Sequence, residues 1–472
     1  MKGLLWVLFE KVGLAALSML VAFWYAILLG PEGFGIASMF LATTLLVTAI
    51  QNNMQQNPLV ATNLDFASAM YASIKGWLLI SVVTVALLYF ALISYWGDEY
   101  WLLVLVCICH VPISSISKVL LAELLRNQEY KTIALRSVLG KLLGVVAGIA
   151  LAYMGKVKLA ILVQSLVDIS VQLVIMATRS QLFSLSKVFT RFSRKETGIF
   201  VALFREGIPS GLSVIDGSFK NRGALILLGV LLGPYSSGVF ALAMKLVDVP
   251  RTMIGYGLTT WAIGKLRASA NSDFLLRDVF VSINHIGILV LAPAYLGMAA
   301  ISLPLLTQFF GSEWAEASVI TMLLCFYYLV LSLQLFVPPL LVIKQQTHKI
   351  MWATILSSVI AIIGSVFLVP ALQIYGLLIA LFLSLIPLLY KQDSETSKLL
   401  GVTTLNVIKE TIGLILSAII MLSALAYSRY WLEYENLYLL IVIGVFSYTL
   451  CLSCLYLLGM VDKAKFKKII SL

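Results

Sequence analysis

The chain has 472 residues, of which 61% are hydrophobic and 12% are charged. Soluble domains have about twice that charged share. A mean hydropathy of +1.01 leaves too little polar surface to cover the core of a soluble protein. The composition also excludes disordered, collagenous and disulfide-rich proteins. The net charge of +11 has no compact basic domain to carry it, which excludes a nucleic-acid-binding protein.

About fourteen apolar stretches are long enough to cross a membrane, which takes roughly 20 residues as a helix. The first is too long for a secretory signal peptide, and no small-residue cleavage site follows it. A β-barrel would show short alternating segments instead, so the sequence predicts an all-α, polytopic membrane protein with about 14 transmembrane helices. The expected spans are residues 8–30, 35–56, 75–96, 101–122, 132–153, 158–177, 207–232, 236–260, 279–303, 315–340, 350–369, 373–390, 409–427 and 437–459.

Lysine and arginine are unevenly divided between the turns that join these spans. The turns after the odd-numbered spans hold few basic residues, namely Lys156, Lys158 and Arg429, whereas the other turns and the C-terminal tail are strongly basic. Because loops rich in lysine and arginine stay in the cytoplasm, we expect a multi-pass membrane protein with both termini cytoplasmic.

A weak internal repeat divides the chain. The motif Gly-Pro-x-x-x-Gly follows the first span at residues 30–35 and the seventh at 233–238, both times in a turn expected to face outward. Proline starts helices and glycine lets helices approach closely, so the motif suits a tight helical hairpin. Two halves with the same orientation in the membrane are typical of transporters, in which the substrate site lies between the halves.

The repeat predicts two pseudo-symmetric six-helix lobes and two additional segments. The lobes are residues 1–178 and 207–391, and residues 392–472 carry two appended helices and a basic cytoplasmic tail. Residues 179–206 form a cytoplasmic amphipathic linker, because apolar and basic residues alternate there as in helices that lie on the inner leaflet. A plain topogenic linker is the alternative.

Two neighbouring spans carry charges well inside the membrane, where ionisable groups are costly and mark functional sites. Span 207–232 contains Asp216, Lys220 and Arg222, and span 236–260 contains Lys245, Asp248 and Arg251. Internal ion pairs, Asp216 with Lys220 and Lys245 with Asp248, would make these charges structural links between helices. That alternative explains neither Arg222 nor the basic balance at this level.

Polar residues occur at depth in the first lobe too. Asp168 lies between two glutamines on one helix face and is a candidate for coupling transport to protonation or to a cation, or for hydrogen bonding between helices. His110 is a candidate proton relay, or a packing residue. The amide cluster that includes Gln51, Asn52 and Asn53 either contacts sugars or caps its helix in the headgroup layer.

The sequence also lacks the motifs of several classes. The sequence contains no phosphate-binding Gly-x-x-x-x-Gly-Lys-Ser/Thr motif and no motif of a catalytic nucleophile. It also contains no cluster of metal ligands, since Cys451 and Cys454 lie in an apolar helix without a third ligand. We therefore expect no catalytic residue, no metal and no cofactor, and a transporter rather than an enzyme.

Several motifs, in order along most of the chain, resemble one family of membrane proteins. These motifs are Leu-Leu-Gly-Pro-Glu-Gly-Phe-Gly-Ile at 28–36, Gly-Ile-Pro at 207–209, Leu-Gly-Pro at 232–234, Val-Pro at 249–250, Phe-Phe-Gly-Ser-Glu-Trp at 309–314, and Pro370 with Tyr375-Gly376. They resemble Wzx-type polysaccharide flippases, which serve O-antigen, capsule, exopolysaccharide and lipopolysaccharide biosynthesis within the MATE/MurJ-like (MOP) exporter superfamily. The two additional helices fit the fourteen-span exporters.

The resemblance implies transport of a polyprenyl-diphosphate-linked oligosaccharide across a bacterial cytoplasmic (inner) membrane by alternating access, driven by a cation or proton gradient. Lys220, Arg222, Lys245 and Arg251 would then bind the anionic headgroup, because a diphosphate needs cationic donors in a low-dielectric cavity. Asp168, Asp216, Asp248 and His110 would serve coupling or ion pairing, and Gln51, Asn52 and Asn53 would contact sugars. The partners would be this lipid-linked substrate, membrane lipids and other polysaccharide assembly proteins.

Two further functions stay open. A cation-coupled drug exporter of the MATE type needs an acidic cavity, whereas the charges here are at least as basic as acidic. A non-transporting protein of polysaccharide assembly, or a polymerase, is the second alternative, but a polymerase would be expected to have a large catalytic outer loop. Neighbouring glycosyltransferase genes would favour the flippase, and drug-resistance regulators the exporter.

Overall fold

The computed structural model describes residues 2–62, 64–270, 272–431 and 436–457, and helix is the only regular secondary structure that they form. Within this part of the chain, eleven helices are long and apolar enough to cross a membrane, or twelve if the bent pair Arg194–Gly211 and Val214–Leu232 is one span. The first of them, Ala16–Val60, runs through a break at Gly30 and covers most of the first predicted span and all of the second. The described residues of every predicted span lie mainly in helical elements, which confirms the polytopic all-α fold.

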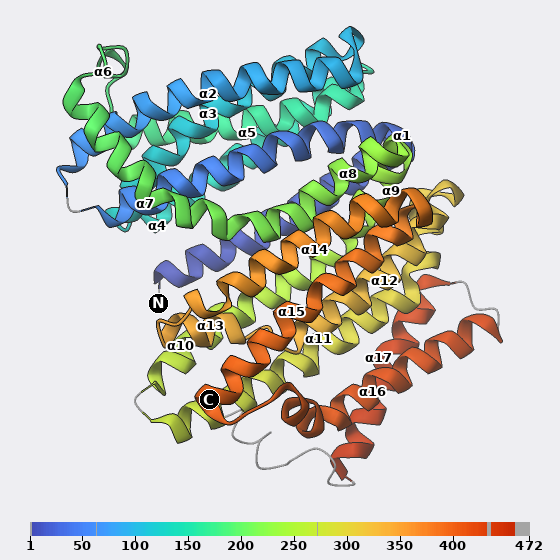
Figure 1. The fold of residues 1–472 in the computed structure, drawn as a ribbon. Coiled ribbons are helices and arrows are strands. Elements are labelled where there is room, and N and C mark those ends of the chain that lie inside the picture. The colour runs from blue at the N-terminus through green and yellow to red at the C-terminus, as the bar shows by residue number, and fades with distance from the viewer. Residues whose placement is uncertain (1, 63, 271, 432–435, 458–472) are drawn as a thin grey trace. The chain divides into compact units, whose positions relative to one another are not determined.

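Two compact units make up the chain, Met1–Gly238 and Val239–Leu472. The predicted seventh span groups with the first unit, so the units do not divide at the predicted linker. Elements of the first unit are coloured blue to green in Figure 1. They are α1 (Lys2–Ala61), α2 (Phe66–Trp96), η1 (Asp98–Tyr100), α3 (Trp101–Arg126), α4 (Tyr130–Tyr153), α5 (Val157–Arg179), α6 (Leu185–Val188), α7 (Arg194–Ser218), η2 (Phe219–Gly223) and α8 (Ala224–Leu232).

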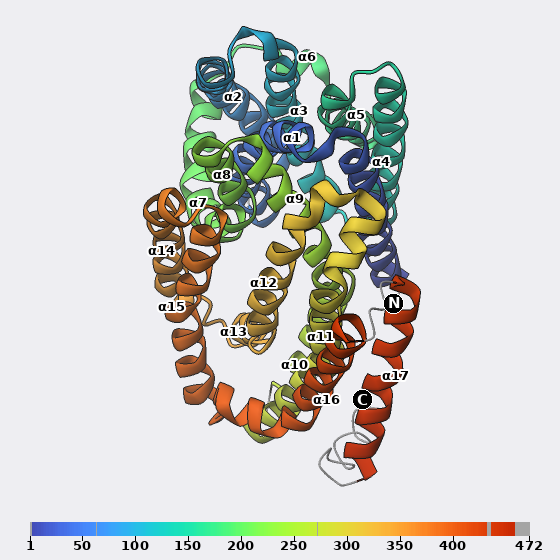
Figure 2. The same ribbon diagram turned by 90° about the vertical axis from the view of Figure 1, so that its right-hand side faces the viewer.

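Helix α9 (Pro234–Pro250) begins in the first unit and continues into the second. The second unit continues with η3 (Arg251–Gly255), α10 (Tyr256–Ala268), α11 (Asp273–Phe310), η4 (Ser312–Trp314), α12 (Ala315–Ser332), α13 (Val337–Ile343), α14 (His348–Leu372), α15 (Ile374–Leu400), α16 (Thr404–Tyr430) and α17 (Leu437–Leu457). Helices α14 and α15 form an antiparallel pair, and α16 packs against α11 and α17 (Figure 2). The predicted additional helices are α16 and α17, and the predicted basic tail lies outside the described residues.

Each unit has its own apolar core. In the first, Leu59, Met70, Leu120 and Met176 join α1, α2, α3 and α5. In the second, the core joins α11, α13 and α16, with Phe280 and Phe336 among its largest fully buried side chains. Helices in a membrane associate through this kind of close packing, because lipid is as apolar as the side chains themselves.

The internal repeat is visible in the backbone. Gly30 and Gly233 precede the two prolines with φ/ψ of 64°/178° and 92°/173°, so each proline begins a helix after the same left-handed turn. A second pair was not recognised in the sequence: Gly97 (81°/173°) and Gly311 (101°/165°) each precede a three-residue 3₁₀ turn that leads into a long helix. These matched turns confirm two pseudo-symmetric halves.

The two copies of the Gly-Pro-x-x-x-Gly motif also contact each other. A Cβ atom added to Gly35 would overlap the carbonyl oxygen of Pro234, and one added to Gly238 would overlap the carbonyl oxygen of Pro31. The contact is therefore reciprocal and brings two helix backbones together at a distance that only glycine permits.

The predicted amphipathic linker differs from one helix lying on a membrane surface. It contains the four-residue α6 and the first turns of α7, and Val188 is buried in the core of the first unit. The Tyr71 hydroxyl of α2 donates to Leu182 O at 2.5 Å and accepts from Ser184 N at 2.7 Å. The first unit therefore holds this segment through its backbone.

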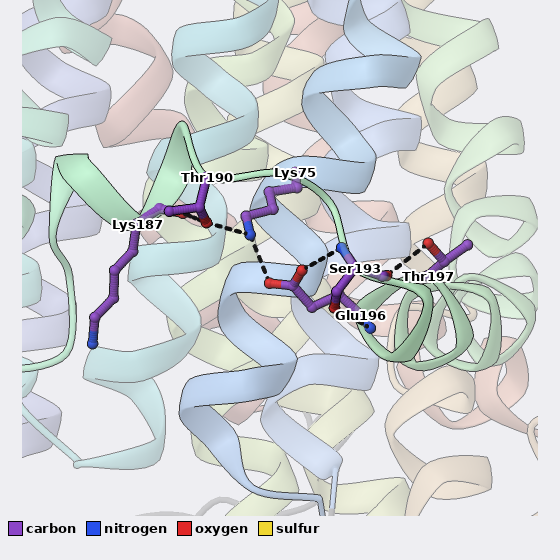
Figure 3. A network of polar contacts seen from close by, with 6 residues as sticks. All are labelled: Lys75, Lys187, Thr190, Ser193, Glu196 and Thr197. Atoms are coloured by element: carbon purple, nitrogen blue, oxygen red, sulfur yellow. Dashed lines mark hydrogen bonds and ion pairs between the residues drawn. The ribbon is translucent and has the colours of Figure 1, made fainter.

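An ion pair holds the start of α7 on α2 (Figure 3). Lys75 Nζ lies 2.7 Å from Glu196 Oε1 and donates to Thr190 Oγ1 at 2.9 Å. Ser193 and Glu196 form a capping box at the helix start, with the Ser193 amide donating to Glu196 Oε2 at 2.8 Å. Both charged side chains are largely buried, so the pair is better insulated from solvent than an exposed ion pair.

Candidate functional site

The charged residues predicted in the seventh span lie on an irregular turn of the helix. Lys220 and Arg222 belong to η2, a π-helical turn between α7 and α8, and such turns are frequent at functional sites. Lys220 is buried, and its Nζ lies 2.9 Å from Asp216 Oδ1. The predicted Asp216–Lys220 pair is therefore formed.

Arg222 leaves this helix in another direction. Its Nη1 donates to the carbonyl oxygen of Leu45 in α1 at 3.3 Å. A backbone oxygen carries no net charge, so this hydrogen bond does not neutralise the guanidinium. Arg222 thus adds a second cation to the η2 turn, beside the Asp216–Lys220 pair.

The eighth span repeats this arrangement in the second unit. Arg251 begins η3, a second π-helical turn, and its Nη1 lies 3.3 Å from Asp248 Oδ1 and 3.2 Å from Tyr328 Oη. The guanidinium also lies over the Tyr328 ring, 5.3 Å from its centroid, where the ring face attracts a cation. Tyr295 stacks on Tyr328, with 6.2 Å between the ring centroids. Lys245, one turn before Asp248, is exposed.

The four predicted headgroup cations are thus divided between the units. Lys220 and Arg222 lie in the first and Lys245 and Arg251 in the second. Asp248 pairs with Arg251, a pair that the sequence had not suggested. Tyr328 was missed because nothing in the sequence connects α12 with η3.

Asp168 faces a stripe of small residues on α4. A Cβ atom added to Gly140 would come within 2.7 Å of Asp168 Oδ1, and one added to Gly144 within 3.2 Å of Asp168 Cβ. Gln172 donates to Asp168 Oδ1 at 2.7 Å and accepts a hydrogen bond from Arg136. The predicted polar stripe of α5 therefore forms hydrogen bonds inside the first unit, and Arg136 is the partner that the sequence did not reveal.

His110 is buried in α3 close to the same face of α5. Its Nε2 lies 3.3 Å from Ser165 Oγ, and Nδ1 has no hydrogen-bond partner among the described residues. Ser165 and Asp168 are one turn apart on α5, so His110 of α3 contacts α5 one turn away from Asp168. The Oε1 of Gln164 is also buried there without a hydrogen-bond partner in the described part of the chain.

The amide cluster of α1 links neighbouring helices. Gln51 donates to Thr84 Oγ1 at 3.0 Å, and Asn52 donates to Ser114 Oγ at 3.1 Å. Asn53 donates to the carbonyl oxygen of Ala49 in its own helix at 2.8 Å. Each of these amide groups therefore already donates a hydrogen bond within the first unit, so a sugar contact would add to these bonds or replace them.

No group of three or more His, Cys, Asp or Glu side chains in the described ranges is arranged to hold a metal ion.

Residues 25–319 match a family profile described as polysaccharide biosynthesis protein. The chain belongs to this family. No curated protein sequence matches the chain. The fold is similar to that of the lipid II flippase MurJ in an inward closed conformation, with a TM-score of 0.75 at 15% identity over 94% of this chain and 98% of that one.

Two transporters of known structure are also similar. An inward-facing multidrug resistance MATE family transporter of the MOP superfamily has a TM-score of 0.61 at 14% identity over 82% of this chain and 95% of that one. A eukaryotic MATE transporter has a TM-score of 0.52 at 14% identity over 88% of this chain and 97% of that one. The family match and the shared fold confirm the predicted resemblance to the MATE/MurJ-like superfamily.

Proposed function

We propose that the protein flips a polyprenyl-diphosphate-linked oligosaccharide across a bacterial cytoplasmic membrane by alternating access. The observation that carries the proposal is the pair of π-helical turns in consecutive spans, with Lys220 and Arg222 on one and Arg251 on the other. Membership of a polysaccharide biosynthesis family supports the class of substrate.

The charge balance of these turns favours an anionic ligand. The predicted headgroup set has four cations, Lys220, Arg222, Lys245 and Arg251, and the two acids beside them are Asp216 and Asp248. A diphosphate offers several oxygens to such donors, and each charged hydrogen bond contributes about 1.5–3 kcal/mol. An exporter of organic cations would need the opposite balance.

Coupling to a proton gradient is assigned to Asp168 and His110 as part of the same proposal. Asp168→Asn keeps a group that hydrogen-bonds with Gln172 and removes the charge. We expect slower transport and a weaker dependence on external pH in this variant, at a normal yield of folded protein. Unchanged transport and pH dependence would leave Asp168 only a packing role.

The headgroup site is tested in cells that lack the chromosomal copy and carry a plasmid copy. Arg222→Ala, Lys245→Ala and Arg251→Ala are compared with Lys156→Ala, which removes an exposed turn cation. We expect the first three to reduce surface polysaccharide, by about tenfold or more for each charged bond lost, and to accumulate lipid-linked oligosaccharide inside the cell. Normal display in all three would show that the headgroup binds elsewhere.

A purely structural ion-pair network behaves differently. Lys220→Ala would then lower the yield of folded protein, because it leaves the Asp216 carboxylate without its ammonium partner. The double variant Asp216→Ala/Lys220→Ala would partly restore that yield. Under the headgroup proposal the double variant folds but still exports poorly.

A further inference from the structure

Three lysines converge on one buried carboxylate at the end of the α14–α15 pair that carries His348 and Leu400. Lys391 Nζ and Lys398 Nζ lie 2.8 and 3.3 Å from Glu395 Oε1, and Lys349 Nζ lies 3.6 Å from Glu395 Oε2. The Glu395 side chain is only 3% exposed, whereas the lysine side chains are 36–65% exposed. We call these four residues the lysine cluster.

The lysine cluster is not balanced in charge. One carboxylate neutralises one of three ammonium groups, and the two that contact Oε1 lie within about 6 Å of each other, where like charges repel. The buried Glu395 fixes their positions while their ends stay accessible. By contrast, Lys344 and Asp273 form a one-to-one pair at 2.9 Å in the same unit. The lysine cluster therefore has an excess of two positive charges that an anion would relieve.

An exposed apolar stripe leads away from the lysine cluster along α14. It begins at Trp352, one turn after Lys349 and 73% exposed, and continues at intervals of three or four residues. Its further members are Leu356, Val359, Ile363 and Phe367, all exposed. On α15, Tyr390 beside Lys391 is 77% exposed. Tryptophan and tyrosine in such positions mark the level of lipid headgroups.

We propose that the lysine cluster is a binding site for an anionic phospholipid. The phosphate would lie against the ammonium groups of Lys391, Lys398 and Lys349, and an acyl chain would lie along the α14 stripe past Trp352. A lipid fits better than a free phosphate ion, because only an amphiphile uses both the cations and the apolar stripe that continues from them. The positive-inside rule accounts for lysines at a helix end, but not for their convergence on one buried acid.

Tryptophan quenching tests this site directly. The full chain is reconstituted in phosphatidylcholine vesicles that contain an equal fraction of either brominated phosphatidylglycerol or brominated phosphatidylcholine. Since the chain has nine tryptophans, the Trp352 signal is taken as the difference from Trp352→Phe. We expect at least about threefold stronger quenching of Trp352 by the anionic lipid at low salt, and a smaller preference at high salt.

Charge variants decide what causes the preference. Lys398→Gln leaves Glu395 two lysine partners and should reduce the preference by half or more, whereas the control Lys344→Gln should retain it. Glu395→Gln keeps the side-chain oxygen Oε1, which Lys391 and Lys398 contact, and removes the negative charge. It should therefore strengthen the preference for the anionic lipid, which a loss of folding cannot imitate. Equal quenching by both lipids, an equal loss in Lys344→Gln, or a weaker preference in Glu395→Gln would overturn the proposal. Abolition of the preference by inorganic phosphate would overturn the lipid in favour of a free anion.

Discussion

The reciprocal crossing of the two Gly-Pro-x-x-x-Gly motifs should make Gly35 intolerant of even one methyl group. In Gly35→Ala the new Cβ would overlap the carbonyl oxygen of Pro234 and lie 2.9 Å from the amide nitrogen of Gly238. Both obstacles are backbone atoms, so no rotamer change relieves the overlap. The helices would have to separate at the crossing.

The expected cost follows from this geometry. Overpacking a close contact lowers the free energy of unfolding by about 1–3 kcal/mol, and a clash between two backbones belongs at the upper end of that range. Gly33→Ala is the matched control two residues away, because its Cβ would come no closer than 3.3 Å to any atom, and those nearest atoms belong to the flexible side chain of Leu29. Alanine also favours helix over glycine by about 1 kcal/mol, so this control should be neutral or slightly stabilising.

The measurement is the apparent melting temperature in detergent, read as the loss of the monodisperse peak after heating, together with surface polysaccharide in complemented cells. Gly35→Ala and Gly238→Ala should both melt lower than Gly33→Ala. The double variant should lose less than the two single losses added together, because both changes separate one crossing. A Gly35→Ala protein as stable as Gly33→Ala would show that the two motifs do not cross at this distance.

Three further predictions concern the linker, the second unit and the topology. Removing either Lys75 or Glu196 alone should destabilise the protein more than removing both, with a coupling of about 1–3 kcal/mol in a double-mutant cycle of thermal stability; strict additivity would mean that the pair contributes nothing. Tyr328→Phe keeps the ring under Arg251 but removes the hydroxyl, so it should reduce export less than Tyr328→Ala, and equal losses would argue against the cation–π contact. If both termini are cytoplasmic, a cysteine placed at Lys465, outside the described residues, should resist an impermeant thiol reagent applied from outside, and labelling there would overturn the topology.

The sequence by itself determined the class and the helical plan of this protein. Hydrophobic stretches of about 20 residues leave no other choice in a membrane, because every backbone polar group must find its partner within the helix. For this reason the described part of each predicted span is mainly helical. The repeat could also be predicted at 30–35 and 233–238, where proline and glycine leave a clear signal, but not at Gly97 and Gly311, where only the backbone angles match.

The candidate site was predicted as a set of charges and not as a set of contacts. Helical spacing places Asp216 beside Lys220, since residues four apart share a face, and that pair is present. Only the tertiary structure decides that Arg251 rests on Tyr328, that Gln172 connects Asp168 with Arg136, and that the amides of Gln51 and Asn52 link helices. Such contacts join segments far apart in the chain, so they depend on which helices pack together, and no local periodicity encodes that choice.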